Sequence, residues 1–464
     1  MSRLIIVSNR VAYPGEGGAR AGGLAVAMYE ALDHYGGMWF GWSGETNDAT
    51  VEPRIAESSH VTYVTADLTT EDYQNYYIGY ANGTLWPLFH NQIGLTKFSR
   101  PAFDGYLRVN TRMAAMLAPL IRPDDVIWVH DYHLIPFGDE LRKLGVNNPI
   151  GFFLHTPFPP RQLLETLPRH ALLLHSFAAY DLVGFQTDES LRAFQDCVIE
   201  LARGHCYGGG AFVLGERHGS AAVFPIGIDT ERFAKYARRT SRSRHTTRLK
   251  ESLSGRSLII GVDRLDYSKG IPHRFDAIDA LLTDHPEHRN EVSFLQIAPH
   301  SRSDVAEYKA LRRDLEAAVG AINGKFAEYD WTPLRYVNRA FSRLVLAGFY
   351  RAARIGLVTP LRDGMNLVAK EYVAAQDPED PGVLVLSRFA GAANELKAAL
   401  LVNPYDADDI ASAIHRGLRM SLDERQMRWR HMMDVVSDNT VTTWRESYLS
   451  SLYETQLERV AAVG

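Results

Sequence analysis

The chain has 464 residues, of which 46% are hydrophobic and 23% charged, and its formal net charge is −5. This composition is typical of a globular protein with two or three domains, and it excludes disordered and collagen-like chains. The negative charge argues against a protein built to bind nucleic acid, and no apolar run approaches the ~20 residues of a membrane-spanning helix.

The sequence does not have the pattern that predicts export from the cell. The start, Met1-Ser2-Arg3, leads directly into a short apolar run without the hydrophobic segment and cleavage site of a signal peptide. The two cysteines, Cys197 and Cys206, have neither a Cys-x-x-Cys nor a zinc spacing. Free thiols in a reducing compartment are therefore expected, and the protein is predicted to be cytoplasmic.

Short apolar runs of strand-forming residues alternate with helical stretches along the whole chain. Alternation of this kind predicts parallel sheets covered by helices on both faces. Two such series predict an α/β fold of two Rossmann-like, doubly wound parallel-sheet domains, with ligands beyond the carboxyl ends of the strands. The expected strands are 4–8, 126–130, 150–155, 182–186 and 221–226 in the first series, and 257–262, 292–298, 354–359, 382–387 and 400–402 in the second.

The domain boundaries follow from the order of these runs. The stretch 40–110 is weakly periodic and rich in Trp, Tyr and Gly, so it is expected to be an irregular insertion over the ligand-binding face of the first domain. The predicted parts are a first domain at 1–228, a linker at 229–254, a second domain at 255–438, and a helix at 439–464 that packs back on the first domain.

A glycine-rich segment near the start precedes a helical stretch. Gly22 and Gly23 lie in this segment, and paired glycines before a helix let the backbone approach a diphosphate or a sugar closely. The pattern alone is weak, so a flexible loop without a ligand stays open as the alternative.

The segment His130-Asp131-Tyr132-His133 has the composition of a metal site. Its two histidines are expected to point in different directions, and no other ligand pair has zinc spacing, so no metal is expected. Asp131 at a strand end is instead predicted to accept hydrogen bonds from substrate hydroxyls. His155 also closes an expected strand, before a proline-rich turn, and the alternative for it is an ordinary core histidine.

One stretch is strongly basic. Residues 232–250 contain eight lysines and arginines and no acidic residue. A phosphate-binding patch is conceivable, but the aromatic residues that nucleic-acid sites place among their charges are nearly absent. We therefore interpret the stretch as a solvated helix and linker face.

The second series contains two strand-to-helix turns with chemical potential. Arg264 and Lys269 lie in the turn after the expected strand 257–262, where two cations can bind a diphosphate. Salt bridges to Asp263 and Asp266 are the alternative.

The other turn spans residues 362–372, where free backbone N–H groups and the helix dipole favour an anion. Asp363 is placed for a sugar attached to that anion, and Glu371 for ribose hydroxyls. An ordinary helix cap is the alternative for this turn.

Six segments together resemble the trehalose-6-phosphate synthase family, and most closely its bacterial single-domain type. The resemblance runs from Met1 to about Leu452. The segments are Ser8-Asn9-Arg10, Ala21-Gly22-Gly23-Leu24, Trp39-Phe40-Gly41-Trp42-Ser43-Gly44, His130-Asp131-Tyr132-His133, residues 261–269, and Arg362–Tyr372.

The resemblance implies a GT-B fold, in which two Rossmann-like domains face each other across a cleft. It implies transfer of glucose from a nucleotide sugar, usually UDP-glucose, to glucose 6-phosphate, with retention of the anomeric configuration and without a metal or other cofactor. Family members often form dimers or tetramers, so a homodimer or homotetramer is expected. Uracil, guanine and adenine all stay open as the donor base.

The resemblance also implies roles for particular residues, with His155, Asp131, Arg264, Lys269 and Asp363 forming the catalytic set. The acceptor would be bound by Arg10, Tyr77, Trp86, Asp131 and Arg302. The donor would be bound by Gly22, Gly23, Arg264, Lys269, Phe341, Asp363, Gly364, Met365, Asn366, Leu367, Val368, Ala369, Lys370 and Glu371.

Three other functions compete with this one. A related enzyme of the same fold would use another acceptor, as a glucosylglycerol-phosphate synthase or a cyclitol-coupling enzyme does. A non-catalytic regulatory subunit would be expected to have lost a charged donor-site residue, whereas all of them are present. A nicotinamide-dependent dehydrogenase lacks support, because no Gly-x-Gly-x-x-Gly follows the first strand.

Overall fold

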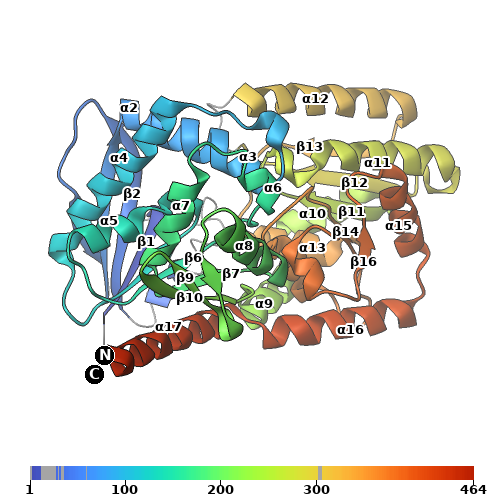
Figure 1. Ribbon diagram of the computed structural model, residues 1–464. Coiled ribbons are helices and arrows are strands. Elements are labelled where there is room, and N and C mark those ends of the chain that lie inside the picture. The colour runs from blue at the N-terminus through green and yellow to red at the C-terminus, as the bar shows by residue number, and fades with distance from the viewer. Residues whose placement is uncertain are drawn as a thin grey trace. The chain divides into compact units, whose positions relative to one another are not determined.

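The computed structural model describes residues 3–11, 28–29, 31–32, 36–58, 60–300 and 306–463, with side chains up to Thr455. Within these residues the chain divides into two compact units (Figure 1). The first unit runs to Pro225 and resumes at Trp444, and the second runs from Ile226 to Thr443.

The first unit is built on a sheet of ten strands in the described part of the chain. Its order is β3-β4-β2-β1-β5-β6-β7-β10-β9-β8, and the strands from β4 to β10 pair in parallel, whereas the edge strands pair antiparallel. The strands are β1 Leu4–Arg10, β2 Gly37–Asn47, β3 Arg54–Ser58, β4 Val61–Thr69, β5 Val126–His130, β6 Ile150–Phe153, β7 Leu182–Phe185, β8 His205–Cys206, β9 Ala211–Leu214 and β10 Arg217–Val223.

The expectation of an irregular insertion at 40–110 is wrong. This stretch contains β3, β4 and most of β2, followed by a π-helical segment and α4. Strand β2 is difficult to recognise in the sequence because it contains glycines, which carry no side chain to pack and normally weaken strands. They are needed there for close backbone approach, since a Cβ on Gly41 would lie 2.0 Å from the Ser8 carbonyl oxygen.

Helices cover this sheet, and their ends carry typical capping residues. Thr187 accepts a hydrogen bond from the Ser190 backbone N–H at the start of α8, and two acidic residues in the first turn suit the helix dipole. The helices are α2 Thr70–Asp72, α3 Trp86–Phe89, α4 Arg100–Leu117, α5 Phe137–Lys143, α6 Arg161–Leu164, α7 His170–Ser176, α8 Asp188–Glu200 and α17 Val441–Val463.

The last helix, α17, packs on the sheet of the first unit. The Tyr448 hydroxyl lies 3.1 Å from the carbonyl oxygens of both Phe152 and Leu182. Its ring stacks on Trp128 at a centroid distance of 4.6 Å. A Cβ on Gly151 would lie 2.4 Å from the same hydroxyl, so a glycine in β6 makes room for this helix.

The second unit has a fully parallel sheet with the order β13-β12-β11-β14-β15-β16 in the described residues. The prediction of two parallel-sheet α/β units is therefore confirmed. The strands are β11 Ser257–Val262, β12 Val292–Ile297, β13 Leu334–Val337, β14 Ile355–Val358, β15 Val383–Ser387 and β16 Leu400–Val402. The helices are α9 Thr230–Thr240, α10 Arg244–Leu253, α11 Ile271–Asp284, α12 Ala306–Phe326, α13 Arg343–Ala352, α14 Leu367–Ala375, α15 Ala407–Arg419 and α16 Leu422–Asp438.

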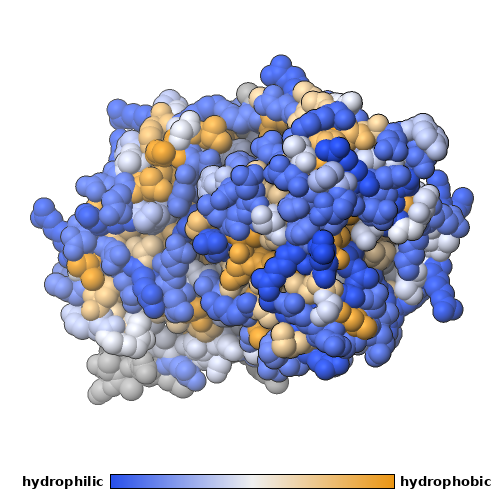
Figure 2. All heavy atoms as spheres, turned by 90° about the vertical axis from the view of Figure 1, so that its right-hand side faces the viewer, coloured by the Kyte–Doolittle hydropathy of each residue, from blue (hydrophilic) through white to orange (hydrophobic). Residues whose placement is uncertain are grey.

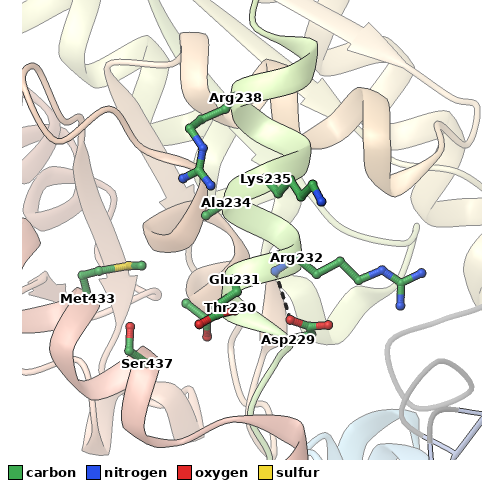
Figure 3. Close-up of a pocket in the computed structure, with 9 residues that line it drawn as sticks. All are labelled: Asp229, Thr230, Glu231, Arg232, Ala234, Lys235, Arg238, Met433 and Ser437. Atoms are coloured by element: carbon green, nitrogen blue, oxygen red, sulfur yellow. Dashed lines mark hydrogen bonds between the residues drawn. The ribbon is translucent and has the colours of Figure 1, made fainter.

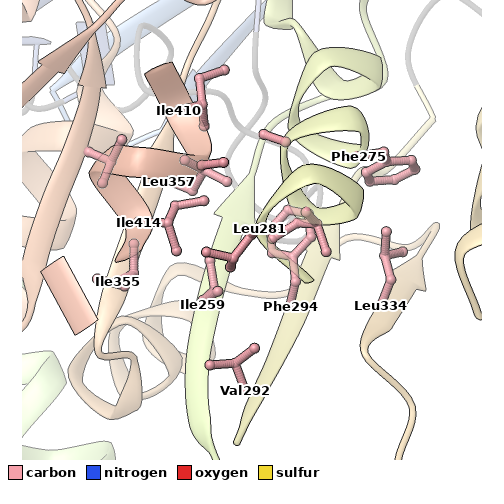
Figure 4. Packing of buried hydrophobic residues seen from close by; sticks show 14 of the residues in the cluster. Ile259, Phe275, Leu281, Val292, Phe294, Leu334, Ile355, Leu357, Ile410 and Ile414 are labelled. Carbon is pink, nitrogen blue, oxygen red and sulfur yellow. The ribbon is translucent and has the colours of Figure 1, made fainter. Parts of the chain in front are cut away.

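One apolar core of the second unit lies between its sheet and the helices α11, α12 and α15 (Figure 4). Ile259, Phe294 and Ile355 project from the strands toward Leu281 of α11 and Ile414 of α15, and all five side chains are buried. Burial of this kind contributes about 1.5–3 kcal/mol for each large apolar side chain. The core holds α11 and α15 firmly against the strands.

Residues 229–254, expected to be a linker with a solvated helix face, form the two helices α9 and α10. Both helices belong to the second unit, where α9 packs on α13 and α14, and α10 packs on α13. Both helices carry many basic side chains, but α9 also has a buried apolar side that includes Phe233 and Ala237. Caps from Asp229 and Ser243 begin the two helices.

Hydrophilic and apolar residues are mixed on the face of the molecule that Figure 2 shows. Figure 2 shows one face of the molecule, on which hydrophilic residues predominate and apolar residues form small separate groups. Among the residues that the structure describes, each helix is too short or too polar to cross a membrane.

Candidate active site

Three of the predicted site residues of the first unit come from neighbouring strand ends. Arg10 ends β1, Asp131 follows β5 directly, and His155 lies two residues after β6. These strands are adjacent in the sheet, and their register places Ser8 beside His130 and His130 beside Phe153. The residues that follow therefore leave the same edge of the sheet.

Asp131 and His155 are held in place by backbone geometry. Asp131 has a φ of 74°, a conformation that non-glycine residues rarely adopt. Its Oδ1 accepts a hydrogen bond of 3.2 Å from the His155 backbone N–H. Unusual backbone conformations of this kind concentrate at functional sites.

The His155 ring belongs to a buried polar group at the same edge. Its Nε2 lies 3.1 Å from Nδ1 of His130, and its Nδ1 lies 3.4 Å from the Gln186 amide at the end of β7. Burial lowers the pKa of His155 to about 3, and burial together with the neighbouring His155 ring lowers the pKa of His130 well below its usual value. Both rings are therefore neutral near pH 7, and His155 is suited to hydrogen bonding with uncharged hydroxyls.

A pH dependence of stability follows from these two rings. An unfolded histidine titrates near pH ~6.5, whereas both folded rings resist protonation at that pH. Below about pH 6.5 the unfolded chain therefore gains protons that the folded chain does not, and the unfolding free energy should fall by at most about 1.4 kcal/mol per pH unit for each ring. Urea denaturation at about pH 7 and pH 5 measures this slope. His155→Gln should reduce the slope, and an unchanged slope in that variant would contradict the assignment.

The aromatic residues predicted to flank the acceptor differ in exposure. Tyr77 lies in the π-helical segment Tyr73–Leu85, is half-buried, and stacks on His133 with ring centroids 6.1 Å apart. Trp86 is only 6% exposed and lies against His90 and Tyr132. Tyr77 can therefore present a ring face to a ligand, whereas Trp86 can present little more than an edge.

Arg10 is exposed, and its guanidinium lies close to Gly44. Gly44 has a φ of +92°, and a Cβ at this position would lie 2.6 Å from Arg10 Nη2. Gly44 lies in one of the six segments on which the family resemblance rests, but the sequence alone did not predict its contact with Arg10. The bulge of β2 therefore leaves space that the guanidinium occupies.

The two predicted turns of the second unit also lie on adjacent strands. Lys269 follows β11 and Asp363 follows β14, and these strands pair in the sheet. The Lys269 ammonium forms an ion pair of 2.5 Å with Asp363, and the Asn366 side-chain amide donates to the same carboxylate at 3.1 Å. Arg264 is exposed in the turn after β11. Cationic groups therefore gather at this strand edge.

Arg274 connects the same two turns, and the sequence did not identify it. Its side chain is completely buried in α11 and forms a 2.7 Å ion pair with Asp263. It also donates to Thr359 Oγ1 at 2.9 Å and to the Lys269 carbonyl at 3.0 Å. The available sequence signal is an arginine within an otherwise apolar helix face. Arg274 thus positions the turns after β11 and β14 relative to each other.

The helix that follows β14 has an open N-terminus. Asn366, with a φ of 77°, precedes α14, which begins at Leu367. Leu367 and Val368 are only half-buried there, so the first-turn N–H groups can approach an anion. Glu371 forms a 2.9 Å ion pair with Arg343, while burial raises the pKa of its carboxyl.

Lys370 was predicted to contact the donor, and the structure places its side chain elsewhere. The ammonium is fully buried, donates to the Ile226 carbonyl at 2.8 Å and pairs with Glu395 at 2.7 Å. Lys370 is therefore a buried structural residue, and only its backbone belongs to the turn.

The remaining predicted residues are of two kinds. Phe341 is half-buried, packs edge-on against Phe349, and has the Arg339 guanidinium 4.7 Å from its ring centroid. Gly22, Gly23 and Arg302 lie outside the described residues.

The basic stretch does not converge on a phosphate site. A cavity of about 600 Å³ lies between α9 and α16, lined in part by Arg232, Lys235 and Arg238. In Figure 3 the side chains of Arg232 and Lys235 extend away from Met433 and Ser437 of α16, whereas the Arg238 guanidinium lies on the side of α9 that faces them. Their divergence agrees with the interpretation of a solvated helix face.

Comparison with known proteins shows the family to which the chain belongs. The model of "Glycosyltransferase family 20" matches residues 8–454. A trehalose-6-phosphate synthase from Sinorhizobium fredii is 50% identical over 456 residues, which cover 97% of this chain and 98% of the relative.

Solved structures are equally similar. An alpha,alpha-trehalose-phosphate synthase (UDP-forming) from Burkholderia xenovorans, in complex with glucose-6-phosphate, has a TM-score of 0.95 and 51% identity, covering 97% of this chain and 100% of that one. A structure from E. coli bound with UDP-2-fluoro glucose has a TM-score of 0.92 and 48% identity, covering 97% and 99%. The chain belongs to glycosyltransferase family 20.

Proposed function

We propose that this protein is a retaining glucosyltransferase that moves glucose from UDP-glucose to glucose 6-phosphate and forms α,α-trehalose 6-phosphate. The observation that carries the proposal is identity of about half over nearly the full length with relatives of this name, in a chain that has charged residues at a strand edge of each unit. Structures of such relatives with glucose-6-phosphate and with a UDP-glucose analogue support the choice of substrates.

The acceptor is assigned to residues of the first unit together with Arg302, which lies outside the described residues. Arg10 and Arg302 would bind the phosphate, because a guanidinium matches phosphate oxygens with two parallel hydrogen bonds. Asp131 would accept hydrogen bonds from sugar hydroxyls, and Tyr77 would pack against the ring. His155, neutral at physiological pH, would donate to or accept from a hydroxyl of the transferred glucose.

The second unit is assigned to the nucleotide sugar. Breaking the glycosidic bond leaves an oxocarbenium-like sugar and a diphosphate with additional negative charge. Arg264, Lys269 and the N-terminus of α14 would stabilise that charge where it develops. Asp363 would accept from glucose hydroxyls while it holds the Lys269 ammonium.

Retention is proposed to occur on one face of the sugar, with the departing phosphate oxygen assisting deprotonation of the incoming hydroxyl. The motivation is that the carboxylates of the site already have other tasks: Asp363 pairs with Lys269, and Asp131 orients His155. A slow donor analogue should leave the protein unmodified in a mass spectrum. A trapped covalent glucosyl-enzyme would contradict this step.

The experiment that tests the function is a donor panel with glucose 6-phosphate as the acceptor. UDP-glucose, GDP-glucose and ADP-glucose are supplied separately, and the product is identified by NMR. We expect α,α-trehalose 6-phosphate with UDP-glucose as the preferred donor. Turnover with glycerol 3-phosphate instead would favour the related acceptor class, and binding of both substrates without turnover would favour a regulatory subunit.

Two finer assignments belong to the same proposal. The protein is proposed to act in the cytoplasm, which agrees with two free cysteines. It is proposed to form a homodimer or homotetramer. Light scattering after size-exclusion chromatography would show a monomer if this assignment were wrong.

Gly44→Ala should raise KM for glucose 6-phosphate by about tenfold or more with a smaller change in kcat. The new methyl group would occupy the position of the Arg10 guanidinium, and loss of one charge-assisted contact costs about 1.5–3 kcal/mol. Initial rates at saturating UDP-glucose measure the effect.

Gly145→Ala is the matched control, because Gly145 has a φ of +83° and a Cβ added there would meet no other atom within 4 Å. It introduces similar backbone strain without touching Arg10. If Gly145→Ala raised KM as much as Gly44→Ala does, backbone strain, and not the displacement of Arg10, would be the cause of the effect.

A further inference from the structure

Three histidines and a glutamate gather on the second unit, away from the strand edge of the same unit that carries Lys269. His285 follows α11 directly, Glu287 and His288 lie in the next turn, and His415 projects from α15. The apolar core between the sheet and its helices holds α11 and α15 against the same strands. The positions of these four side chains, named here the His285 cluster, are therefore set by a rigid scaffold.

The potential ligand atoms of the His285 cluster are close together. Nδ1 of His285 and Nδ1 of His415 each lie 3.7 Å from Glu287 Oε1, and Nε2 of His288 lies 2.9 Å from His415 Nδ1. Ligands bound to zinc at 2.0–2.1 Å in a tetrahedron are separated by about 3.4 Å. The ligand atoms of His285, Glu287 and His415 all lie within 4.8 Å of one another, so these three side chains are close enough to share one ion, and His288 lies beside His415.

The composition of the His285 cluster also suits a metal. The rings of His285 and His415 stack with centroids 3.9 Å apart, so the two imidazoles lie side by side. Imidazole nitrogens and one carboxylate form a donor set typical of Zn²⁺ sites.

The location separates the His285 cluster from the proposed reaction. Lys269 precedes the first residue of the 14-residue helix α11 by two positions, and His285 follows its last. A helix of this length spans about 21 Å. The side chains of His285 and Glu287 retain 31% and 48% exposure, so an ion can reach them from solvent.

We propose that His285, Glu287, His288 and His415 bind one Zn²⁺ ion, which links the C-terminal end of α11 to α15 and stabilises the second unit. The ion would replace the hydrogen bond between His288 and His415 with coordination to both rings. It is a structural ion and takes no part in glucosyl transfer.

Zinc titration of the full-length protein after removal of metals with EDTA tests the proposal. We expect one Zn²⁺ per chain by isothermal titration calorimetry and a Tm that rises with free zinc. Cobalt in place of zinc should show the intense visible absorption of a tetrahedral site. His285→Gln and His415→Gln should each weaken zinc binding by on the order of 100-fold, comparable to or larger than the effect of losing an outer-shell partner.

His431→Gln is the matched control, because His431 is exposed on α16, outside the His285 cluster. This variant should bind zinc like the parent protein. Circular dichroism of the metal-free variants checks folding, and His285→Gln removes no hydrogen bond that holds α15.

Equal zinc affinity in the parent and in the His285→Gln/His415→Gln double variant would overturn the proposal, as would a Tm that zinc does not raise. Glucosyl transfer is measured separately and should not change with zinc. Failure of the zinc site and failure of the proposed function are therefore distinguishable.

Discussion

Arg264→Ala and Lys269→Ala should each lower kcat by on the order of 100-fold or more. Both cations are assigned to the diphosphate, whose negative charge increases as the glycosidic bond breaks. An interaction that strengthens in the transition state raises kcat, and its loss therefore appears in kcat more than in KM. Steady-state rates at saturating concentrations of both substrates measure the effect.

The two variants need different controls. Lys269→Ala also leaves the Asp363 carboxylate without its ammonium partner, so Lys269→Arg, which keeps the charge, should recover part of the activity. Arg312→Ala removes an exposed arginine from α12 of the same unit and should leave kcat unchanged. A tenfold or smaller loss in both test variants, or a change confined to the KM for glucose 6-phosphate, would refute their assignment to the leaving group.

Arg274→Met should lower the unfolding free energy of the protein by about 3–5 kcal/mol. The substitution keeps most of the side-chain volume but leaves the buried Asp263 carboxylate without its 2.7 Å partner. It also removes the bonds from Arg274 to Thr359 and to the Lys269 carbonyl. Since these bonds join the turns after β11 and β14, kcat should fall as well, although Arg274 touches no substrate in the proposal.

A double-mutant cycle separates the charge from the packing. Asp263→Asn with Arg274→Met removes both members of the ion pair, so the double variant should be less destabilised than the sum of the two single variants. Chemical denaturation monitored by tryptophan fluorescence gives the three free energies. Strict additivity would show that the ion pair is not the source of the stability. Rescue of kcat by Arg274→Lys is not expected, because an ammonium cannot reproduce the fork of bonds.

The local sequence determined the bounds of three short apolar strands. The runs 126–130, 257–262 and 400–402 were predicted with the bounds that β5, β11 and β16 have in the structure. Such runs are continuous and apolar, and polar or glycine-rich turns end them on both sides. Because the carboxyl ends of parallel strands share an edge, the sequence also predicted that Asp131 and Asp363 lie at such edges.

Strand β2 shows where local reasoning fails. Its glycines and aromatic residues have no clear period, and only pairing with β1 and β4 on its two sides makes the stretch a strand. Residues 229–254 were expected to be a linker with a solvated helix face, and their packing into the second unit was missed for a related reason. Their charged residues outnumber the apolar ones, and the apolar side is recognisable only once α13 packs against it.

Side-chain partners were decided by the tertiary structure alone. Lys370 and Glu371 are neighbours in sequence, yet one pairs with Glu395 and the other with Arg343. Arg274 bonds to two turns, and His285 stacks on His415, only because elements that are distant in the sequence pack together. A chain pattern specifies which residues are apolar and where strands end, whereas the direction and partner of a polar side chain depend on contacts between segments far apart in the sequence.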